Sequence, residues 1–204
     1  MAQALLELLK SKFGSDILET HSQHGDDTAV VAPGAWREVA RFLRDDPRCS
    51  MEMLVDLTCV DFPDREPRFE VVAHLHSLSK GKRLRLKSRV GDEDGDGAEI
   101  DSLAELWGSA NWAEREAFDM FGVRFKDHGD LRRILLYPEF VGHPLRKDYP
   151  ANKIQPLVPY REQPGTEKLP PFGPSEGMPF GRQSFDRVGE DDEPLVATDL
   201  ERMS

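Results

Sequence analysis

Carboxylates and guanidinium groups are concentrated between residues 114 and 133, where they could pair with one another or with a charged partner. The cluster consists of Glu114, Arg115, Glu116, Asp119, Arg132 and Arg133. Its acidic members are expected near a helix N-terminus, which favours negative charge, and the two later arginines lie close enough in the sequence to fold back on them. The cluster contains no nucleophile and no set of metal ligands. It therefore indicates either a structural ion-pair network or a binding surface.

Two histidines and a row of basic residues lie on neighbouring strands that the sequence predicts. His74 and His76 stand two residues apart, so they share one face of a strand, but no third ligand is adjacent. We therefore expect histidines at a surface or an interface rather than a metal site. The basic row consists of Arg83, Arg85, Lys87 and Arg89. Such a row is typical of a solvated sheet face, or of a surface that meets an acidic partner, anionic lipid or nucleic acid.

Several common function classes are disfavoured. The sequence has no glycine-rich phosphate loop, no G-x-S-x-G elbow and no H-E-x-x-H helix. Its two cysteines, Cys49 and Cys59, fall in an apolar segment and are expected in the core. They are too few for an iron–sulfur cluster or a structural zinc site, each of which normally needs four ligands. The net charge of −11 argues against general nucleic-acid binding.

Membrane insertion is not indicated either. No stretch approaches the roughly 18 uninterrupted apolar residues of a spanning helix. The N-terminus lacks a basic region followed by a long apolar stretch, which is the pattern of a secretion signal. We therefore expect the chain to stay in the cytoplasm.

Hydrophobic periodicity predicts an α+β fold. Helices are expected at residues 2–12, 36–43, 102–107 and 112–121. Strands are expected at residues 28–32 and 51–60, the second apolar enough for a central position, and an antiparallel hairpin with one apolar face at 69–90. These elements predict a small mixed or antiparallel sheet of about four strands, backed by helices on one face.

Helix-end signals accompany the last two helices. Ser102 and Asn111 each precede a glutamate by three residues, which is capping-box spacing. Gly108 and Gly122 are expected to end these helices, Gly122 in the left-handed conformation. The stretch from 91 to 97 is expected to be a solvated loop because it is rich in glycine and acid.

The C-terminal part differs in composition from the rest. From residue 137 onward prolines recur every few residues, which forbids long helices and internal strands. Residues 161–204 carry ten acids and five bases and few large apolar residues. We therefore predict a domain over residues 1–148 and an extended, partly disordered strap over 149–204, which orders only along another protein.

The charged cluster also carries a family resemblance. Residues 114–121 read Glu-Arg-Glu-x-x-Asp-Met-Phe and are followed, after six residues, by His128 and, after three more, by Arg132-Arg133-Ile-Leu. Residues 142–150 read Gly-His-Pro-Leu-Arg-Lys-Asp-Tyr-Pro. Together these motifs resemble the family of the C subunit of NADH-quinone oxidoreductase, and the resemblance extends more weakly over about residues 27–160.

The resemblance implies a peripheral-arm subunit of respiratory complex I, on the cytoplasmic face of the bacterial inner membrane and held there indirectly through the complex. In that family the subunit holds no flavin and no cluster. The expected partners are other peripheral-arm subunits, above all the large subunit that forms the quinone cavity. Electrons from NADH would pass through FMN and iron–sulfur clusters in neighbouring subunits to quinone. The chain would be part of a proton-translocating oxidoreductase while having no catalytic residue of its own.

We hypothesise that nine charged residues lock the strap and a partner against the domain: Glu114, Arg115, Glu116, Asp119, Arg132, Arg133, Arg146, Lys147 and Asp148. Three alternatives stay open. A related membrane-bound hydrogenase contains a similar docking subunit. An independent adaptor would recruit a basic partner through the acidic tail. A stand-alone metal-dependent hydrolase is the third.

Overall fold

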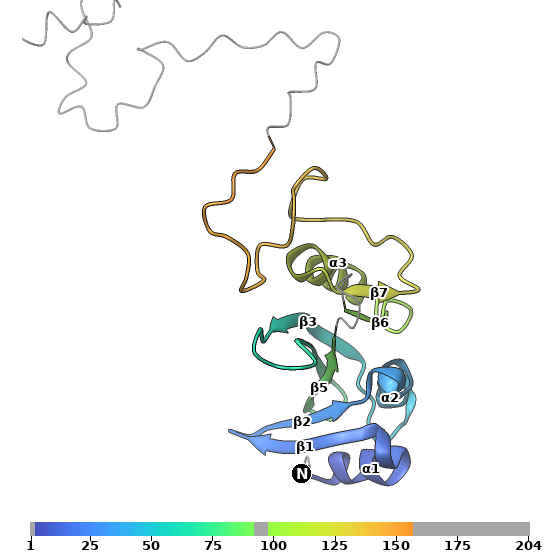
Figure 1. The fold of residues 1–204 in the computed structure, drawn as a ribbon. Coiled ribbons are helices and arrows are strands. Elements are labelled where there is room, and N and C mark those ends of the chain that lie inside the picture. The colour runs from blue at the N-terminus through green and yellow to red at the C-terminus, as the bar shows by residue number, and fades with distance from the viewer. Residues whose placement is uncertain (1–2, 92–97, 157–204) are drawn as a thin grey trace, which may run out of the picture. The chain divides into compact units, whose positions relative to one another are not determined.

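The main sheet of the protein is mixed and five-stranded (Figure 1). The computed structural model describes residues 3–91 and 98–156, all of which belong to the first of two compact units, residues 1–158. The strands are β1 (Ile17–Gln23), β2 (Asp26–Val31), β3 (Met53–Asp61), β4 (Phe69–Ser77) and β5 (Lys82–Val90). Their order is β1-β2-β5-β4-β3, in which only β2 and β5 run parallel.

Helices and a second small sheet complete the unit. The α-helices are α1 (Gln3–Phe13), α2 (Trp36–Asp45) and α3 (Ala110–Phe121), and short 3₁₀ turns cover Gly14–Asp16 and Pro33–Ala35. Strands β6 (Glu99–Asp101) and β7 (Arg124–Lys126) pair in parallel. Helix α3 packs along β3, and the Ser109 hydroxyl at its start donates to the Leu54 carbonyl at 3.0 Å.

Strand alternation gives the sheet two unlike faces. One face buries Phe69, Val71, Ala73 and Leu75 of β4, together with their partners Leu84, Leu86 and Val90 on β5. These side chains join one hydrophobic cluster with residues of all three α-helices, including the fully buried Trp36 and Leu9. The opposite face, which we call the polar face, carries the histidines of β4 and the basic row of β5.

The predicted α+β class with a mixed sheet is confirmed. Helices α1 and α2, strand β2 and the β4–β5 hairpin lie where the periodicity places them, and Gly122 ends α3 with φ of 80°. The sheet has five strands instead of the predicted four, because the sequence did not predict β1. Most residues of β1 are exposed or half-buried, so the strand shows no apolar alternation.

Two element predictions are wrong. The apolar run predicted at 51–60 forms β3 (Met53–Asp61) at the sheet edge rather than in its centre, and the edge position leaves Met53, Val55 and Val60 partly exposed on the polar face. Residues 102–107 form turns instead of a helix. The Ser102 hydroxyl and the Leu103 N–H both donate to the Glu114 carboxyl, so Ser102 does not form the predicted capping box.

The predictions for the loop at 92–97 and the tail beyond 156 lie outside the described residues. The proposed domain boundary after residue 148 stays a prediction.

Candidate functional site

A buried carboxylate, Asp119, holds the segment after β7 against helix α3. Its Oδ2 accepts hydrogen bonds from three consecutive backbone N–H groups, those of Ile134, Leu135 and Leu136, at 2.9 to 3.0 Å. Its Oδ1 accepts from Arg133 Nη1 at 2.7 Å. Asp119 lies in the last turn of α3, not near the N-terminus where the sequence placed it. Specific donors therefore stabilise its charge, not the helix dipole.

Asp119 is charged because the hydrogen bonds that it accepts lower its pKa by more than burial raises it. Burial opposes ionisation of this fully buried carboxyl, but the hydrogen bonds from the Leu136 N–H, from Arg133 and from the other two amides hold its pKa below the usual range. Arg133 also donates to the Gly142 carbonyl at 3.0 Å. One ion pair thus connects α3 with two points on the chain that follows β7.

Glu114 is buried too, in a separate network. Its carboxyl accepts from the Ser102 hydroxyl and from the Leu103 N–H, each at 2.6 Å. Burial raises the pKa of Glu114 to about 7, although these two hydrogen bonds and the charge of Arg37 act in the opposite direction. Glu114 therefore titrates near neutral pH rather than serving as a permanent anion.

His128 lies beside Glu114, with 3.9 Å between His128 Nε2 and Glu114 Oε2. Its Nδ1 accepts the Asp130 N–H at 3.0 Å, so the ring proton is on Nε2, which donates to the Asn111 carbonyl at 3.1 Å. Both ring nitrogens are thus satisfied with a neutral imidazole. At 3.9 Å the contact between His128 and Glu114 is too long for a hydrogen bond.

The C-terminal predicted residues contact a second buried carboxylate, Asp61 at the end of β3. Arg68 donates to both oxygens of Asp61 at 2.7 and 2.8 Å and to both oxygens of Asp148 at 3.1 and 2.9 Å. The Lys147 N–H also donates to Asp61, at 2.7 Å. The hydrogen bonds from Arg68 hold the pKa of Asp61 below its usual range against the effect of burial. Arg68 is thus a clamp between β3 and residues 147–148.

Arg146 joins the neighbouring part of this segment to the end of α3. Its Nε donates to the Phe121 carbonyl at 2.5 Å, and its guanidinium lies 5.1 Å from the Phe69 ring centroid. Gly122 makes this approach possible, because a Cβ there would lie 2.5 Å from Arg146 Nη2 and 2.6 Å from the His143 ring.

The structure therefore divides the nine predicted residues. Asp119 pairs with Arg133 as expected, whereas Arg132 pairs with Asp130 at 2.7 Å and Glu114 bonds Ser102. Arg146, Lys147 and Asp148 hold their own segment to α3 and β3. Glu116 and the Lys147 side chain face solvent and make no ion pair within residues 3–91 and 98–156. Arg68 and Asp61 were missed, since a single arginine beside a turn carries no distinctive spacing.

An exposed apolar surface lies over these internal locks. Trp112 is 60% and Leu135 is 62% exposed. Arg115 connects them, because its guanidinium lies 5.3 Å from the Trp112 ring centroid and donates to the carbonyls of Arg132 and Arg133. We call Trp112, Arg115, Arg132 and Leu135 the α3 surface. Exposed aromatic, aliphatic and arginine side chains are typical of protein interfaces.

The two thiols of the chain are poor candidates for metal binding. Burial raises the pKa of the Cys59 thiol to about 12 and also raises that of Cys49, which disfavours the thiolate that binds metals. Across the described ranges, no three His, Cys, Asp or Glu side chains gather as a metal-holding group. No helix in this part of the chain is long and apolar enough to span a membrane.

Known sequences show clear similarity to the chain. Residues 29–155 match the family described as the 30 kDa subunit of respiratory-chain NADH dehydrogenase. The C subunit of NADH-quinone oxidoreductase from Citrifermentans bemidjiense is 45% identical over 142 residues, which are 70% of this chain and 85% of the relative. A C subunit of the same enzyme from Rhizobium etli is 39% identical over 183 residues, which are 86% of this chain and 92% of the relative.

Solved structures share the fold. A trypsin-resistant fragment of Nqo5 is 28% identical with a TM-score of 0.52, covering 62% of this chain and 98% of the fragment. A chain of the membrane-bound sulfane sulfur reductase, an archaeal respiratory membrane complex, has a TM-score of 0.60 at 23% identity. It covers 74% of this chain and 86% of its own length, and at that identity the likeness concerns the fold alone.

Proposed function

Because the chain belongs to the family of the 30 kDa subunit of respiratory-chain NADH dehydrogenase, we propose that it works as a scaffold subunit of NADH-quinone oxidoreductase, complex I. The observation that carries this proposal is the match over residues 29–155, together with relatives named as the C subunit of that enzyme at up to 45% identity. The role we assign is docking. The chain holds neighbouring subunits in register, and the chemistry takes place in them.

The geometry of α3 supports a docking role. Asp119 and Arg133 fix the segment after β7, and the Arg68 clamp fixes residues 147–148. Both locks are internal, so they hold the backbone in place while Trp112 and Leu135 stay exposed above it. A surface that is already ordered binds with a smaller loss of conformational entropy than a mobile one. We propose that the α3 surface is covered by a partner, the large subunit of the quinone cavity.

We propose that the chain itself binds no cofactor. Its two thiols are buried and resist deprotonation, and its buried carboxylates Asp119 and Asp61 already accept hydrogen bonds from arginine and amide donors. FMN and iron–sulfur clusters would then belong to sister subunits, which pass electrons from NADH to quinone. The chain would sit peripherally at the cytoplasmic face of the bacterial inner membrane, attached through its neighbours.

Purification from native membranes tests this proposal. The tagged chain is isolated after mild solubilisation, its companions are identified by mass spectrometry, and NADH-dependent quinone reduction is assayed. We expect flavin and iron–sulfur subunits to copurify with that activity. Recovery of nickel-containing hydrogenase subunits, or of the chain alone, would contradict the proposal.

A further inference from the structure

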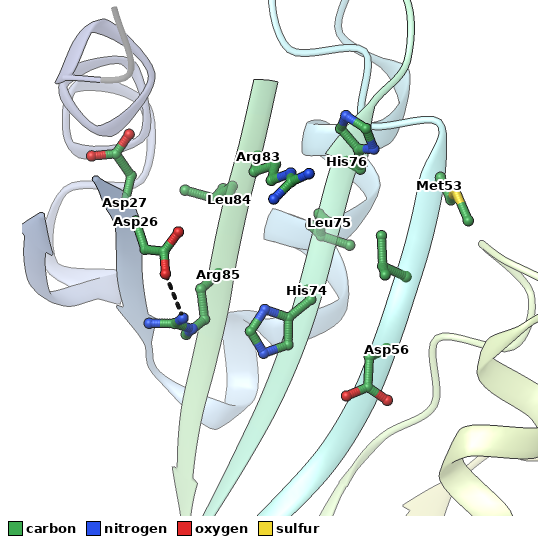
Figure 2. Close-up of a pocket in the computed structure, with 11 residues that line it drawn as sticks. Asp26, Asp27, Met53, Asp56, His74, Leu75, His76, Arg83, Leu84 and Arg85 are labelled. Atoms are coloured by element: carbon green, nitrogen blue, oxygen red, sulfur yellow. Dashed lines mark hydrogen bonds and ion pairs between the residues drawn. The ribbon is translucent and has the colours of Figure 1, made fainter. Parts of the chain in front are cut away.

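The hollow on the polar face of the main sheet does not select one kind of ligand (Figure 2). Asp26, Asp27 and Asp56 line it together with Arg83 and Arg85. Arg85 already pairs with Asp26 at 3.1 Å. Opposite charges this close together favour neither an anion nor a cation, so the hollow points to no ligand. A buried titratable group on helix α3 is more specific.

Glu114 is a fully buried carboxyl that lacks a cation. It shares both helix α3 and complete burial with Asp119. Arg133 neutralises Asp119 at 2.7 Å, whereas no lysine or arginine within residues 3–91 and 98–156 forms an ion pair with Glu114. Ionising a buried carboxyl without a paired cation is costly, so Glu114 is the member of this pair that can hold a proton.

The charges nearest to Glu114 are engaged elsewhere. Arg37 of α2 acts on it, but this guanidinium donates to the Ser102 carbonyl at 3.2 Å and to Asp127 at 2.9 Å. The other charged side chains on α3 and on the elements that pack against it are exposed or have partners of their own: Asp56, Asp61, Arg115, Glu116, Lys126 and Arg133. His128 is the remaining polar side chain beside the carboxyl.

His128 carries the nearest donor that an ionised Glu114 can recruit. Its Nε2–H donates to the Asn111 carbonyl at 3.1 Å, and Nε2 lies 3.9 Å from Glu114 Oε2. A movement of about 1 Å brings Nε2 within hydrogen-bond distance of that oxygen. A hydrogen bond to a carboxylate is roughly twice as strong as one to a neutral carbonyl. Ionisation of Glu114 therefore favours transfer of this donor from Asn111 to the carboxylate.

Movement of the His128 ring reaches the α3 surface by two routes. Asn111 lies in the first turn of α3 and directly precedes Trp112, which is 60% exposed. On the other side of the ring, Nδ1 accepts the Asp130 N–H at 3.0 Å, and the Asp130 carboxylate pairs with Arg132 at 2.7 Å. Trp112 and Arg132 both belong to the α3 surface. One imidazole thus links the buried carboxyl to two members of that surface.

We infer that Glu114 is a proton switch for the α3 surface. While Glu114 is protonated, His128 holds Asn111 and the surface keeps the arrangement that docks a partner. When Glu114 is ionised, the His128 Nε2–H turns to the carboxylate and that arrangement is lost. The inference rests on the proposed function only in that the α3 surface is a docking surface.

The switch operates around neutral pH, because burial raises the pKa of Glu114 to about 7. Only the protonated chain is competent to dock, so the competent fraction falls about tenfold between pH 6 and pH 8. Docking is therefore tighter in mild acid and weaker above neutral pH.

Nuclear magnetic resonance of the full-length chain tests the switch without a partner. We expect the Glu114 carboxyl carbon and the Trp112 indole N–H to titrate together, with a shared midpoint at pH about 7. Glu114→Gln keeps the shape of the side chain but cannot ionise, so it should abolish the Trp112 titration. Glu105→Gln removes an exposed carboxylate from the turn that Glu114 holds, and it should leave the titration unchanged.

Two results of this titration would overturn the switch. The first is a different midpoint for Glu114 and Trp112 in the wild-type chain, which decides the matter even where Glu114→Gln does not fold. The second is a Trp112 titration that persists in Glu114→Gln, since another group such as His128 would then cause it.

Capture of sister subunits tests the effect on docking. The tagged full-length chain is titrated into solubilised membranes of a strain that lacks it, at pH 6 and at pH 8. The chain concentration for half-maximal capture should rise about tenfold at pH 8 for wild type and less than about twofold for Glu114→Gln. A tenfold rise for both chains, or for neither, overturns the inference.

The failures of the two proposals are distinguishable. Capture that is equally strong at both pH values leaves the proposed function intact and overturns the switch alone. Absence of any captured sister subunit at either pH overturns the proposed function and, with it, the role of the switch in docking. The link between Glu114 and Trp112 is judged by their titration alone.

Discussion

Arg133 Nη1 and Asp119 Oδ1 form a buried ion pair at 2.7 Å that joins the segment after β7 to the last turn of helix α3. The second oxygen of the same carboxylate accepts three consecutive backbone N–H groups, so one side chain orders both the arginine and residues 134–136. Leu135 is exposed directly on this ordered backbone. The ion pair therefore shapes the surface that we propose for docking, although it contacts no partner itself.

Asp119→Asn should destabilise the folded chain by about 3 kcal/mol, because it removes the charge from a buried pair and turns an amide donor toward other donors. Urea unfolding of the full-length chain measures this loss. Asp130→Asn is the matched control, since the Asp130–Arg132 pair is exposed and should contribute less than about 1 kcal/mol. Equal effects of the two substitutions would contradict the assignment of Asp119 as a structural anchor.

The Asp119 contribution should also depend on pH. Its pKa is lowered in the folded state, so the unfolded chain binds the proton more readily. The stabilisation is therefore complete above the unfolded pKa of about 3.9 and is lost as pH falls through the folded pKa. Wild type and Asp119→Asn should converge in stability in strong acid, and a constant difference down to pH 2 would argue against this linkage.

Glu114 should give a pH dependence of the opposite sign. Its folded pKa of about 7 lies above the unfolded value, so its stabilisation is complete only below the unfolded pKa of about 4.3 and is lost progressively as pH rises from there through 7. The full effect is about 3 kcal/mol between pH 4 and pH 8. Glu114→Gln mimics the neutral form and should remove this part of the slope, whereas the exposed Glu116→Gln should not. An unchanged slope in Glu114→Gln would show that the carboxyl is ionised throughout.

Asp61→Asn should loosen the segment that contains Arg146 and Lys147. The substitution weakens the hydrogen bonds from Arg68 and from the Lys147 N–H, so the chain at residues 146–148 opens more often. If the substitution lowers the free energy of opening this segment by about 1.4 kcal/mol, the open form becomes about tenfold more populated. Trypsin should then cleave after Arg146 or Lys147 about tenfold faster. Asp64→Asn, an exposed change in the same turn, serves as control. If cleavage rates match wild type, Arg68 and Asp61 do not restrain this segment.

Leu135→Glu should impair assembly without unfolding the chain. The side chain is 62% exposed, so a charge costs little in the free chain but is buried and unpaired once a partner covers the α3 surface. We expect about tenfold less partner recovered on the tagged chain and a change in unfolding free energy of less than about 0.5 kcal/mol. Leu18→Glu makes the same substitution at an exposed position of β1. Full recovery of partners with Leu135→Glu would place the interface elsewhere.

Periodicity was sufficient to predict the core of the fold. The β4–β5 hairpin alternates between apolar and polar residues with few exceptions, such as Val72 and Ser88, and α2 has a well-defined apolar face, so both elements could be placed from the sequence. Strand β1 could not, because its residues after Ile17 are exposed or half-buried on both faces and so show no apolar alternation. The apolar run of β3 was misassigned to the sheet centre because a run of apolar residues is typical of a strand buried on both faces. In the structure, part of this apolar surface is exposed on the polar face, at Met53, Val55 and Val60.

The charged cluster was found, but its pairing was predictable only in part. The short sequence separation correctly predicted that an arginine near residue 133 would pair with Asp119. The spacing of Asn111 and Glu114 also predicted a capping box, which the structure does not contain. Glu114 instead bonds Ser102 and Leu103, which come from a turn rather than a helix. Long-range contacts such as Arg68 with Asp148, 80 residues apart, depend on the tertiary arrangement of β3 and leave no local signal.

Deleting the gene for this chain tests the central claim most directly. Membranes of the deletion strain, with and without the full-length chain supplied in trans, are assayed for NADH-dependent quinone reduction and for retention of the flavin and iron–sulfur subunits. A scaffold subunit of complex I predicts that both are lost on deletion and restored together by the chain. Full activity and retained subunits in its absence would contradict that account.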